Sequence, residues 1–513
     1  MGKRVLELRG SGLSLKTLVF FSRAPRDTIL IKVSASSIEK MKTNRKFAET
    51  VAGRGDAVYG LSVGVGVRKK TKKKRSELVE FNNRMVRDHK SAIGPSLPTD
   101  VVRAAAILLL NTLAAGRTNV RPMLASHFAD RLSNGPELQG VPIYGGTGVG
   151  DVAQLPFLIL DLLRGFGGEG DIRLTTGEAL PLIAQSSIVA AHSALAIYDT
   201  EILLEELTAN AALDLEAYSA NPSPYSEMVG TVRPYAGYQK ALRKIRNYLH
   251  GGSLTSSIAK KPKHLQTPLS FRTLGVVLGS AFDALSFCKK QIAVELNAHQ
   301  QNPLVLEEED RMMGCGNFDM QAVAAMLDFM RIAVAPCLTS QTERSIKLLQ
   351  KSETGLTDGL EPLDDAGGHG LSEIAWPLQG LCVEAKSLVT PVSCEIGSSS
   401  QAEGIEDRMS MAGLSARRLH DMVGLGFRCL SISTVISNQA IDLRNKMEAQ
   451  FQQGTDLEES HRRMRELVPE MKKLSRVPDP DAMEALYKGL QDGLLSKCAS
   501  KRPAINRLSP CKL

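Results

Sequence analysis

The sequence predicts a mainly α-helical protein with a long central helix bundle and a small mixed region at its N-terminus. The first observation is a set of long helix-favouring stretches. The longest runs from Glu178 to Tyr218 with almost no breaker other than Pro181, which is tolerated near a helix start. The second is that residues 1 to 100 alternate short apolar runs, such as Thr28 to Val33, with polar connectors. Helices this long exceed those of an ordinary α/β domain and are typical of a bundle.

Further long helices are predicted in the rest of the chain. They cover Val101 to Ala115, Arg272 to Asn297, Gln321 to Gln341, Leu371 to Val389 and Glu406 to Gln450, and two or three charged helices are expected from Leu457 to Leu495. We therefore divide the chain into an N-terminal region (1–175), a central bundle (176–450) and a C-terminal helical extension (451–513). No repeat of fixed period is present, so a solenoid is not expected.

The composition is that of a folded, water-soluble protein, with 43% hydrophobic and 23% charged residues among 513. No uninterrupted apolar run reaches the length of about eighteen residues typical of a membrane span, and the start MGKRVLELRG lacks the apolar core of a signal peptide. We therefore expect a cytoplasmic protein with no membrane partner. The last three residues, Cys511 to Leu513, resemble the Ser-Lys-Leu peroxisomal address with Cys in place of Ser, which makes a peroxisomal location the alternative.

The cysteines argue against a disulfide framework and against a metal site. Eight are scattered along the chain without a CxxC pair, at Cys288, Cys315, Cys337, Cys382, Cys394, Cys429, Cys498 and Cys511. This distribution fits reduced thiols. No bound metal is expected.

Much of the excess of positive over negative charge lies in one short run. The net charge is +8, and the residues from Arg68 to Arg75 read RKKTKKKR. Such a run can attract an anionic ligand, can act as a nuclear-import signal, or can be a solvated loop. Because no aromatic residues are interleaved with it, nucleic acid is not the favoured partner.

A glycine-rich segment offers one nucleotide-binding interpretation. Gly148 to Ala153 satisfies the pattern GxGxxA, with Glu169 or Asp171 about twenty residues further on. The context argues against it, because only Val141 to Tyr144 could form a preceding strand, and Pro142 interrupts that strand. Nothing downstream alternates strands and helices as a parallel sheet requires.

Seven short blocks, in order along nearly the whole chain, carry a resemblance to a known family. They are Tyr59 to Gly66, Arg87 to Gly94, Asn111 to Gly116 followed by Val120-Arg121-Pro122, Gln266 to Arg272, Asn302-Pro303-Leu304, Gly316-Asn317-Phe318, and Glu406 to Met411. In these blocks the chain resembles histidine ammonia-lyase and its phenylalanine and tyrosine relatives. The resemblance implies a helix bundle of the histidine ammonia-lyase and fumarase-like type. It also implies a homotetramer in which each site is assembled from three chains.

The family resemblance draws attention to Val149. In the family, the Ala-Ser-Gly backbone of Gly-Ala-Ser-Gly-Asp cyclises and loses water to form a methylidene-imidazolone, the electrophile that attacks the substrate. Aligned on Gly150 and Asp151, the alanine becomes Gly148 and the serine becomes Val149. Valine has no hydroxyl to eliminate. We therefore treat Gly148, Val149 and Gly150 as a former prosthetic-group segment and expect no cofactor.

Other replacements lie on the side of the electrophile. Ala184-Gln185-Ser186 stands where the family has N-G-T, Leu269 stands where it has the tyrosine of Q-D-x-Y-S-L-R, and Ser62 and Val63 replace Asn and Thr in the Tyr59 loop. By resemblance, several of these lost polar groups serve the electrophile or the amine that it holds. They have been lost together with its serine.

Several site residues of the family are retained. By resemblance, Tyr59 is the proton-abstracting phenol, Arg272 pairs with the substrate carboxylate, and Asn111 lies near Arg272. Phe318 lies beside the former prosthetic group, and His89 with Glu406 lines the imidazole end. Asn302 is a further expected substrate-binding residue, and Glu406 joins Tyr59 as a catalytic candidate.

The chemistry of the retained residues supports the same roles. The guanidinium of Arg272 matches a carboxylate with two donors, and a tyrosine beside cationic groups can act as a base. The structural alternatives are a tyrosine at a glycine turn, an arginine that bridges helices, and a glutamate at a helix N-terminus.

These observations lead to one expected function and two alternatives. We expect a cofactor-independent lyase, acting by elimination or by the reverse addition or cyclisation, on a carboxylate-bearing small molecule that can also carry an imidazole or an amine. The first alternative is a catalytically inactive paralogue that serves as a binding or assembly subunit. The second is an ammonia-lyase with a non-standard prosthetic group.

Overall fold

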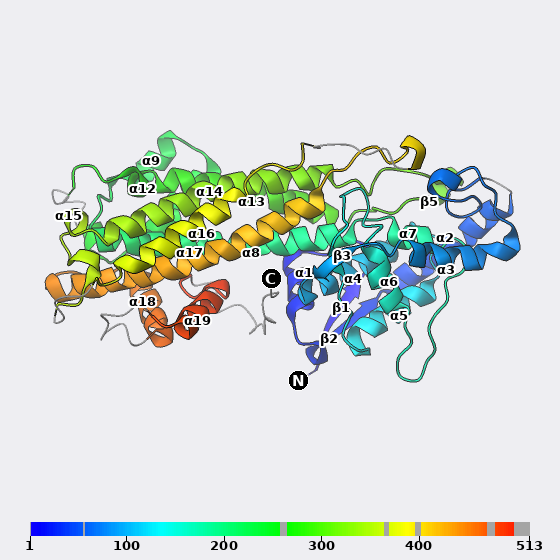
Figure 1. Ribbon diagram of the computed structural model, residues 1–513, viewed down its shortest axis with the longest axis horizontal. Coiled ribbons are helices and arrows are strands. Elements are labelled where there is room, and N and C mark those ends of the chain that lie inside the picture. Colours follow the sequence, from blue (N-terminus) through cyan, green and yellow to red (C-terminus); the bar gives the residue numbers. More distant parts are fainter. Residues whose placement is uncertain are drawn as a thin grey trace.

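The computed structural model describes residues 2–54, 57–256, 264–363, 369–394, 402–468 and 478–496. The predicted fold class is confirmed, because 63% of the structure is helix and only 6% is strand. A long bundle occupies one side of the elongated molecule, and a smaller mixed region, which contains the N-terminus, occupies the other (Figure 1).

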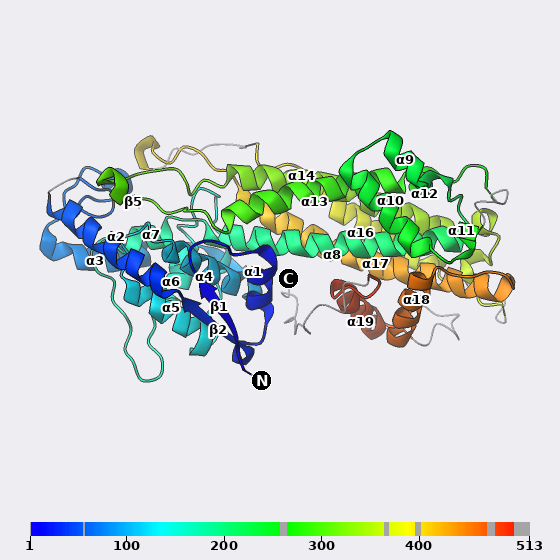
Figure 2. The ribbon, with the colours of Figure 1, turned by 180° about the vertical axis from the view of Figure 1, so that it is seen from behind.

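Helix α8 (Ser187–Tyr218) lies at the centre of the bundle. It packs against α17 (Ala412–Met447), α14 (Gln321–Leu348) and α13 (Leu274–Glu295), and the outer helices α10 (Ala236–Leu249) and α16 (Ala375–Ser387) complete the bundle (Figures 1 and 2). Every residue of α8 except Tyr198 and Glu201 is buried. Its apolar residues therefore pack against neighbouring helices on every side, and its buried carboxylates, such as Asp214, are paired within the bundle.

The N-terminal region combines short strands with helices. Strand β1 (Arg4–Leu8) pairs in parallel with β2 (Ile29–Val33), and α1 (Leu15–Arg23) connects them. Helix α4 (Thr99–Ala114) joins this region to the bundle by packing against α8. The described strands form only two-stranded sheets, which are not the parallel sheet of a nucleotide-binding fold.

The remaining elements connect or cover these two parts. The helices are α2 (Ala35–Gly53), α3 (Leu78–Asp88), α5 (Pro122–Asn134), α6 (Leu155–Leu162), α7 (Ala179–Ile183), α9 (Glu227–Val232), α11 (Ser253–Ser256), α12 (Leu269–Arg272), α15 (Lys351–Thr354), α18 (Thr455–Leu467) and α19 (Pro480–Gln491). The strands β3 (Ile93–Ser96) and β4 (Pro142–Tyr144) pair with each other, as do β5 (Leu304–Leu306) and β6 (Arg311–Met313).

The stretch from Glu178 to Tyr218, predicted as one helix, is two helices. Helix α7 ends at Ile183, and Ala184 has a non-helical backbone with φ −91° and ψ 62°. The buried side chain of Gln300 accepts a hydrogen bond from the backbone N–H of Ser186 at 3.3 Å, and α8 begins at the next residue. The break depends on Gln300, which is distant in sequence, so local helix preference could not reveal it.

The last long helix of the bundle begins later than predicted. Helix α17 starts at Ala412, after Met411 adopts a left-handed backbone with φ 55°. Glu406 therefore lies in the exposed loop before the helix. The prediction that a helix opens at Glu406 is wrong, and so is the structural alternative of Glu406 as a helix N-terminal residue.

Three segments are long and apolar enough to cross a membrane by length and composition, so the sequence-based exclusion of any such segment was too strict. They are Ala179–Tyr218, Gln321–Leu348 and Ala412–Met447. The most apolar part of the first is entirely buried inside the protein, and the corresponding parts of the other two are 61% and 72% buried. Their apolar character is explained by their place in the core of the bundle.

The C-terminal extension packs on the bundle. Both oxygens of the buried Glu206 carboxylate, on α8, accept backbone hydrogen bonds, from Leu495 N at 2.8 Å and Ser496 N at 2.7 Å. Helices α18 and α19 are the two charged helices expected here. Cys498 and the C-terminal tripeptide with Cys511 lie outside the described residues.

Replacing Arg344 by methionine is expected to destabilise the bundle by about 3–5 kcal/mol, because one partner of a buried ion pair is lost. Arg344 on α14 donates to Asp214 on α8 at 2.7 Å, and the two side chains are 1% and 0% exposed. Denaturant unfolding measures the loss. The control is Lys347→Met on the same helix, which removes only a surface pair with Glu343 and should cost about 1 kcal/mol or less. Equal losses would contradict this assignment.

Replacing Asp151 by asparagine is expected to make stability less dependent on pH. Burial raises the pKa of Asp151 to about 7, against the effect of the backbone N–H groups of Ile188 and Val189, which donate to Oδ2. Since the pKa is higher in the folded state, folding favours the protonated carboxyl. Its stabilising contribution is complete below about pH 4 and is lost as the pH rises to 7. The loss is at most roughly 4 kcal/mol, at about 1.4 kcal/mol per pKa unit.

Thermal unfolding midpoints of the two proteins at pH 5 and pH 8 test this expectation. The midpoint of Asp151→Asn relative to the wild type should rise from the lower to the higher pH. A constant difference would show that Asp151 does not titrate in this window.

Candidate functional site around the glycine segment

The loop from Gly145 to Asp151, here called the glycine segment, lies where three distant parts of the chain meet. Val149 forms an isolated antiparallel bridge with Asp319. The backbone N–H of Met320 donates to Gly148 O at 2.9 Å, and that of Met411 donates to Thr147 O at 2.8 Å. The loops before α14 and α17 therefore hold the segment by its backbone, whatever its side chains are.

Gly148 has no room for a side chain. It has φ +82°, and a Cβ atom on it would lie 2.2 Å from Ser410 Oγ and 2.7 Å from Ala412 N. The Ser410 hydroxyl uses this space to donate to Gly148 O at 2.7 Å. An alanine, which the family has here, would require the backbone around Ala412 to move. Together with the missing hydroxyl at Val149, this packing means that the residues present do not fit the methylidene-imidazolone.

Phe318 lies beside the segment, as the resemblance implied. Its ring is 3.8 Å from the position of a Cβ on Gly150, and its carbonyl accepts from Ser186 Oγ at 2.6 Å. Asn302 begins the loop that leads to Phe318. Its Oδ1 accepts from Cys315 N at 3.1 Å, which orders this loop.

Tyr59 lies in a glycine turn between α2 and α3, in the N-terminal region. Its hydroxyl oxygen accepts a hydrogen bond from Gly66 N at 2.9 Å, and the residue is half-buried. Gly60 packs directly on Leu180 of α7, since a Cβ on Gly60 would lie 2.4 Å from Leu180 Cδ2. The residue Gln185, just after α7, accepts from Asp151 N at 2.7 Å. Helix α7 thus connects the Tyr59 turn to the glycine segment.

His89 and Glu406 do not form a pair in the part of the chain that the structure describes. His89 follows the last turn of α3, and its Nδ1 donates to Met85 O at 2.7 Å. Glu406 is exposed. Its loop still reaches the Tyr59 end, because the short 3-10 helix η9 (Ala402–Gly404) contacts another, η2 (Gly66–Arg68), which follows the Tyr59 turn.

Arg272 and Asn111 lie far apart within one chain, so the expectation that Asn111 lies near Arg272 requires a site assembled from several chains and stays a prediction. The Asn111 amide is buried, and both its oxygen and its nitrogen are hydrogen-bonded, accepting from Gly10 N at 3.1 Å and donating to Leu296 O at 3.0 Å. Arg272 precedes α13, and Leu296 follows it. With 22 residues, α13 separates the two by about 33 Å.

Arg272 itself has little to bind in the described chain. Its Nη1 donates to Gln266 Oε1 at 3.1 Å, and its shielded Nε has no hydrogen-bond partner among the described residues. No carboxylate there pairs with it. An open groove of about 440 Å³ lies next to it, lined by α12, α13, α14 and α16 side chains that include Leu269, Ile332 and Lys386.

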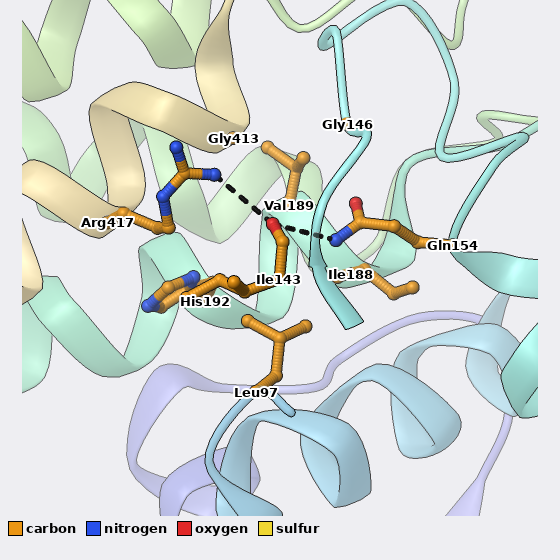
Figure 3. Close-up of a pocket in the computed structure, with 9 residues that line it drawn as sticks. All are labelled: Leu97, Ile143, Gly146, Gln154, Ile188, Val189, His192, Gly413 and Arg417. Carbon is orange, nitrogen blue, oxygen red and sulfur yellow. Dashed lines mark hydrogen bonds between the residues drawn. The ribbon is translucent and has the colours of Figure 1, made fainter. Parts of the chain in front are cut away.

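Behind the glycine segment there is a small enclosed cavity, lined in part by Gln154, His192 and Arg417 (Figure 3). Its volume of about 10 Å³ is enough for roughly one water molecule. Arg417 and Gln154 both donate to Ile143 O. Burial lowers the pKa of His192, with further lowering from His420 and Arg417. This cavity is too small for a substrate.

The sequence interpretation missed two residues that build the site. Ser410 belongs to the quoted Glu406 to Met411 block, but only the structure shows that it fills the space above Gly148. Asp151 served only to align the motif, whereas its carboxylate binds the first turn of α8. An acid just before an apolar helical stretch is a capping signal, but here the acid and the helix are separated by more than thirty residues.

Comparisons with known proteins agree with this architecture. The profile described as aromatic amino acid lyase matches residues 13–466. A histidine ammonia-lyase of Streptococcus pyogenes serotype M3 is 26% identical over 518 residues, covering 95% of this chain and 99% of its own. One from Deinococcus radiodurans is 27% identical over 458 residues, covering 86% of each.

Solved structures show the same fold. The ergothioneine-degrading enzyme ergothionase of Treponema denticola superimposes with a TM-score of 0.86 at 24% identity, covering 96% of this chain and all of that one. Histidine ammonia-lyase of Trypanosoma cruzi gives a TM-score of 0.85 at 22% identity, covering 97% and 95%. With the family profile matched along most of its length, this chain belongs to the aromatic amino acid lyase family.

Proposed function

We propose that this protein is a lyase-type enzyme that works without the methylidene-imidazolone, on a small molecule that bears a carboxylate. The observation that carries the proposal is the packing of the glycine segment. Gly148 has no space for a Cβ, and Val149 has no hydroxyl, yet the segment is held in place between Phe318 and Ser410. The pocket is thus remodelled around a plain peptide, and the other retained candidates must act without an electrophile.

Without an electrophile, the substrate itself must make elimination easier. An ordinary amine is a poor leaving group, and a proton β to it beside an imidazole is only weakly acidic. A substrate whose nitrogen is already quaternary, and so leaves as a neutral amine, meets this need. The reverse addition has the same requirement, because the two directions share one transition state.

In this proposal Tyr59 moves the proton. Its phenol oxygen already accepts a hydrogen bond from Gly66 N, and such a bond strengthens when the oxygen is negatively charged. Glu406 and His89, whose loops lie at the same end of the molecule, orient a polar or nitrogenous group of the substrate. Phe318 and Asn302 form the wall beside the glycine segment.

Arg272 anchors the carboxylate, and in this proposal it does so across an interface between chains. Within one chain the length of α13 alone, roughly 33 Å, separates Arg272 from the end of that helix that contacts Asn111 in the N-terminal region. A homotetramer, with each site assembled from three chains, removes this separation. Large apolar side chains are exposed on the helices near Arg272, including Leu269 at 61%, Ile332 at 46% and Val383 at 66%, and such side chains favour association.

The relatives narrow the substrates to be tried. Several are named as histidine ammonia-lyases, and the ergothionase structure contains desmethyl-ergothioneine sulfonic acid. We therefore propose an imidazole-bearing amino acid derivative as the first class of substrate. Histidine and ergothioneine are the two probes, one with an ordinary amine and one with a quaternary nitrogen.

The intact mass of the purified, denatured protein is expected to equal the mass encoded by the sequence, because Val149 cannot supply the hydroxyl that the prosthetic group requires. Mass spectrometry measures this directly. Analysis of the peptide that contains residues 145–151 then places any change. Loss of two waters within that peptide would contradict the proposal and favour an ammonia-lyase with a non-standard prosthetic group, such as one formed through Thr147.

Replacing Tyr59 by phenylalanine is expected to reduce turnover by about 10²-fold or more, because the group that transfers the proton is removed. Depletion of histidine, ergothioneine and the metabolites of a cell extract is followed by mass spectrometry, and thermal unfolding confirms that the variant is folded. The matched control is Tyr235→Phe, at a tyrosine that is 57% exposed before α10, which should leave turnover unchanged.

Two outcomes would defeat the proposed activity. In one, the wild type depletes no compound. In the other, Tyr59→Phe and Tyr235→Phe deplete the same compound at the same rate. Either result would favour the alternative of an inactive family member that keeps the fold for binding or assembly.

A further inference from the structure

We propose that residues Arg68 to Arg75, here called the basic loop, form a binding site for a compact polyanion of the phosphate type. The loop holds seven Lys or Arg residues and no acidic residue. The net charge of the chain is +8, so the remaining 505 residues together are close to neutral. The excess positive charge is therefore a local property of this loop and not of the protein surface in general.

The cations of the basic loop are not neutralised by the part of the chain that the structure describes. No hydrogen bond or ion pair from a described residue reaches any of their side chains, and all are exposed except the half-buried Lys73. Two acids at this end of the molecule are already paired with arginines outside the loop, and the exposed Glu77 and Glu403 form no ion pair with it among the described residues. Glu80 binds Arg87 at 2.8 Å and Arg173 at 3.0 Å, and Asp310 binds Arg54 at 2.8 Å. The described residues therefore leave these cations available to an anionic ligand.

The basic loop is folded back on itself, which keeps its charges close together. Gly64 N donates to Thr71 O at 3.0 Å, and Lys73 N donates to Ser62 O at 3.2 Å. The Lys73 ammonium lies 4.9 Å from the centre of the Phe81 ring, which fixes the end of the loop. The like charges are thus confined to one short turn, where a ligand with several negative charges relieves their repulsion.

This geometry favours a compact anion over a nucleic acid. A nucleic-acid surface needs a basic patch or stripe that follows the spaced phosphates of the backbone. Here seven cations lie within eight residues of one turn, so only a few phosphates could be contacted by the loop at once. A single carboxylate would leave most of the cations unpaired. A small molecule with two or more linked phosphates matches the number and crowding of the charges.

The basic loop is also part of the Tyr59 turn. Gly66, two residues before the loop, donates its N–H to the Tyr59 hydroxyl at 2.9 Å, and η2 extends from Gly66 into the first residue of the loop. A ligand held by the loop therefore lies next to the candidate site, at the end of the molecule where α2, α3 and β5 are found (Figure 1). The binding site stands on charge and geometry alone and does not require that Tyr59 turns over a substrate.

Isothermal titration of the full-length protein with inorganic tripolyphosphate tests the proposal. Replacing Lys69, Lys70 and Lys72 together by glutamine is expected to weaken binding by about tenfold or more, since these exposed lysines supply much of the local field. The matched control replaces Lys16, Lys32 and Lys446 by glutamine. These are also exposed, remove the same charge and lie outside the loop, so binding should stay within about twofold of the wild type. Thermal unfolding checks that both triple variants are folded.

Several results would overturn the proposal. They are an absence of tripolyphosphate binding by the wild type, equal weakening in the two triple variants, and equal affinity for tripolyphosphate and acetate. A twelve-base oligothymidylate that binds about 100-fold more tightly than tripolyphosphate would assign the loop to nucleic acid instead. Because the readout is binding and not turnover, these results are independent of the outcome of the Tyr59 experiment.

Discussion

The position of the candidate site depends on the Asp151 carboxylate at the buried N-terminus of α8. The first N–H groups of a helix have no partner within it, and here those of Ile188 and Val189 donate to Asp151 Oδ2. If α7 and α8 were one continuous helix, these N–H groups would bind carbonyls of the preceding turn and could not hold Asp151. The break between the helices therefore ties the glycine segment to the helix around which the bundle packs.

Under the proposal that the electrophile is absent, this anchoring explains how the fold is kept without it. Asp151 follows Val149 in the chain, and the carbonyls of Thr147 and Gly148 are held by N–H groups of Met411 and Met320. None of these contacts uses the side chain of residue 149. A change at residue 149 therefore removes none of the hydrogen bonds that hold the segment. The fold places little constraint on this residue, although the chemistry of the family requires a serine there.

The sequence was sufficient for the helices and for the order of the motifs, because long apolar stretches and short blocks are local signals. It failed where a distant residue decides the local structure. The break after Ile183 needs Gln300 and Asp151, and Gly148 is required because Ser410 and Ala412 lie over it. It also could not show that the Asn111 amide is hydrogen-bonded to the backbone of its own chain through both its oxygen and its nitrogen. A motif match suggests a role for a residue, but it does not reveal which hydrogen bonds the side chain of that residue already makes.

Arg272 lies far from the Tyr59 end of its own chain. Under the proposed assembly, the bundle surface near Arg272 would therefore bind another copy of the chain. Exposed apolar side chains, such as Phe287 on α13 and Phe329 on α14, lie on the helices that extend from Arg272. When these side chains are buried against another copy, the same contact would bring Arg272 to the Tyr59 end of that copy. The energy of association would then come from apolar area, which is not specific. The guanidinium, which pairs with no carboxylate among the described residues of its own chain, would supply the specificity. Under this proposal, Arg272 pairs with no described carboxylate of its own chain because its partner is the substrate bound at the Tyr59 end of another copy.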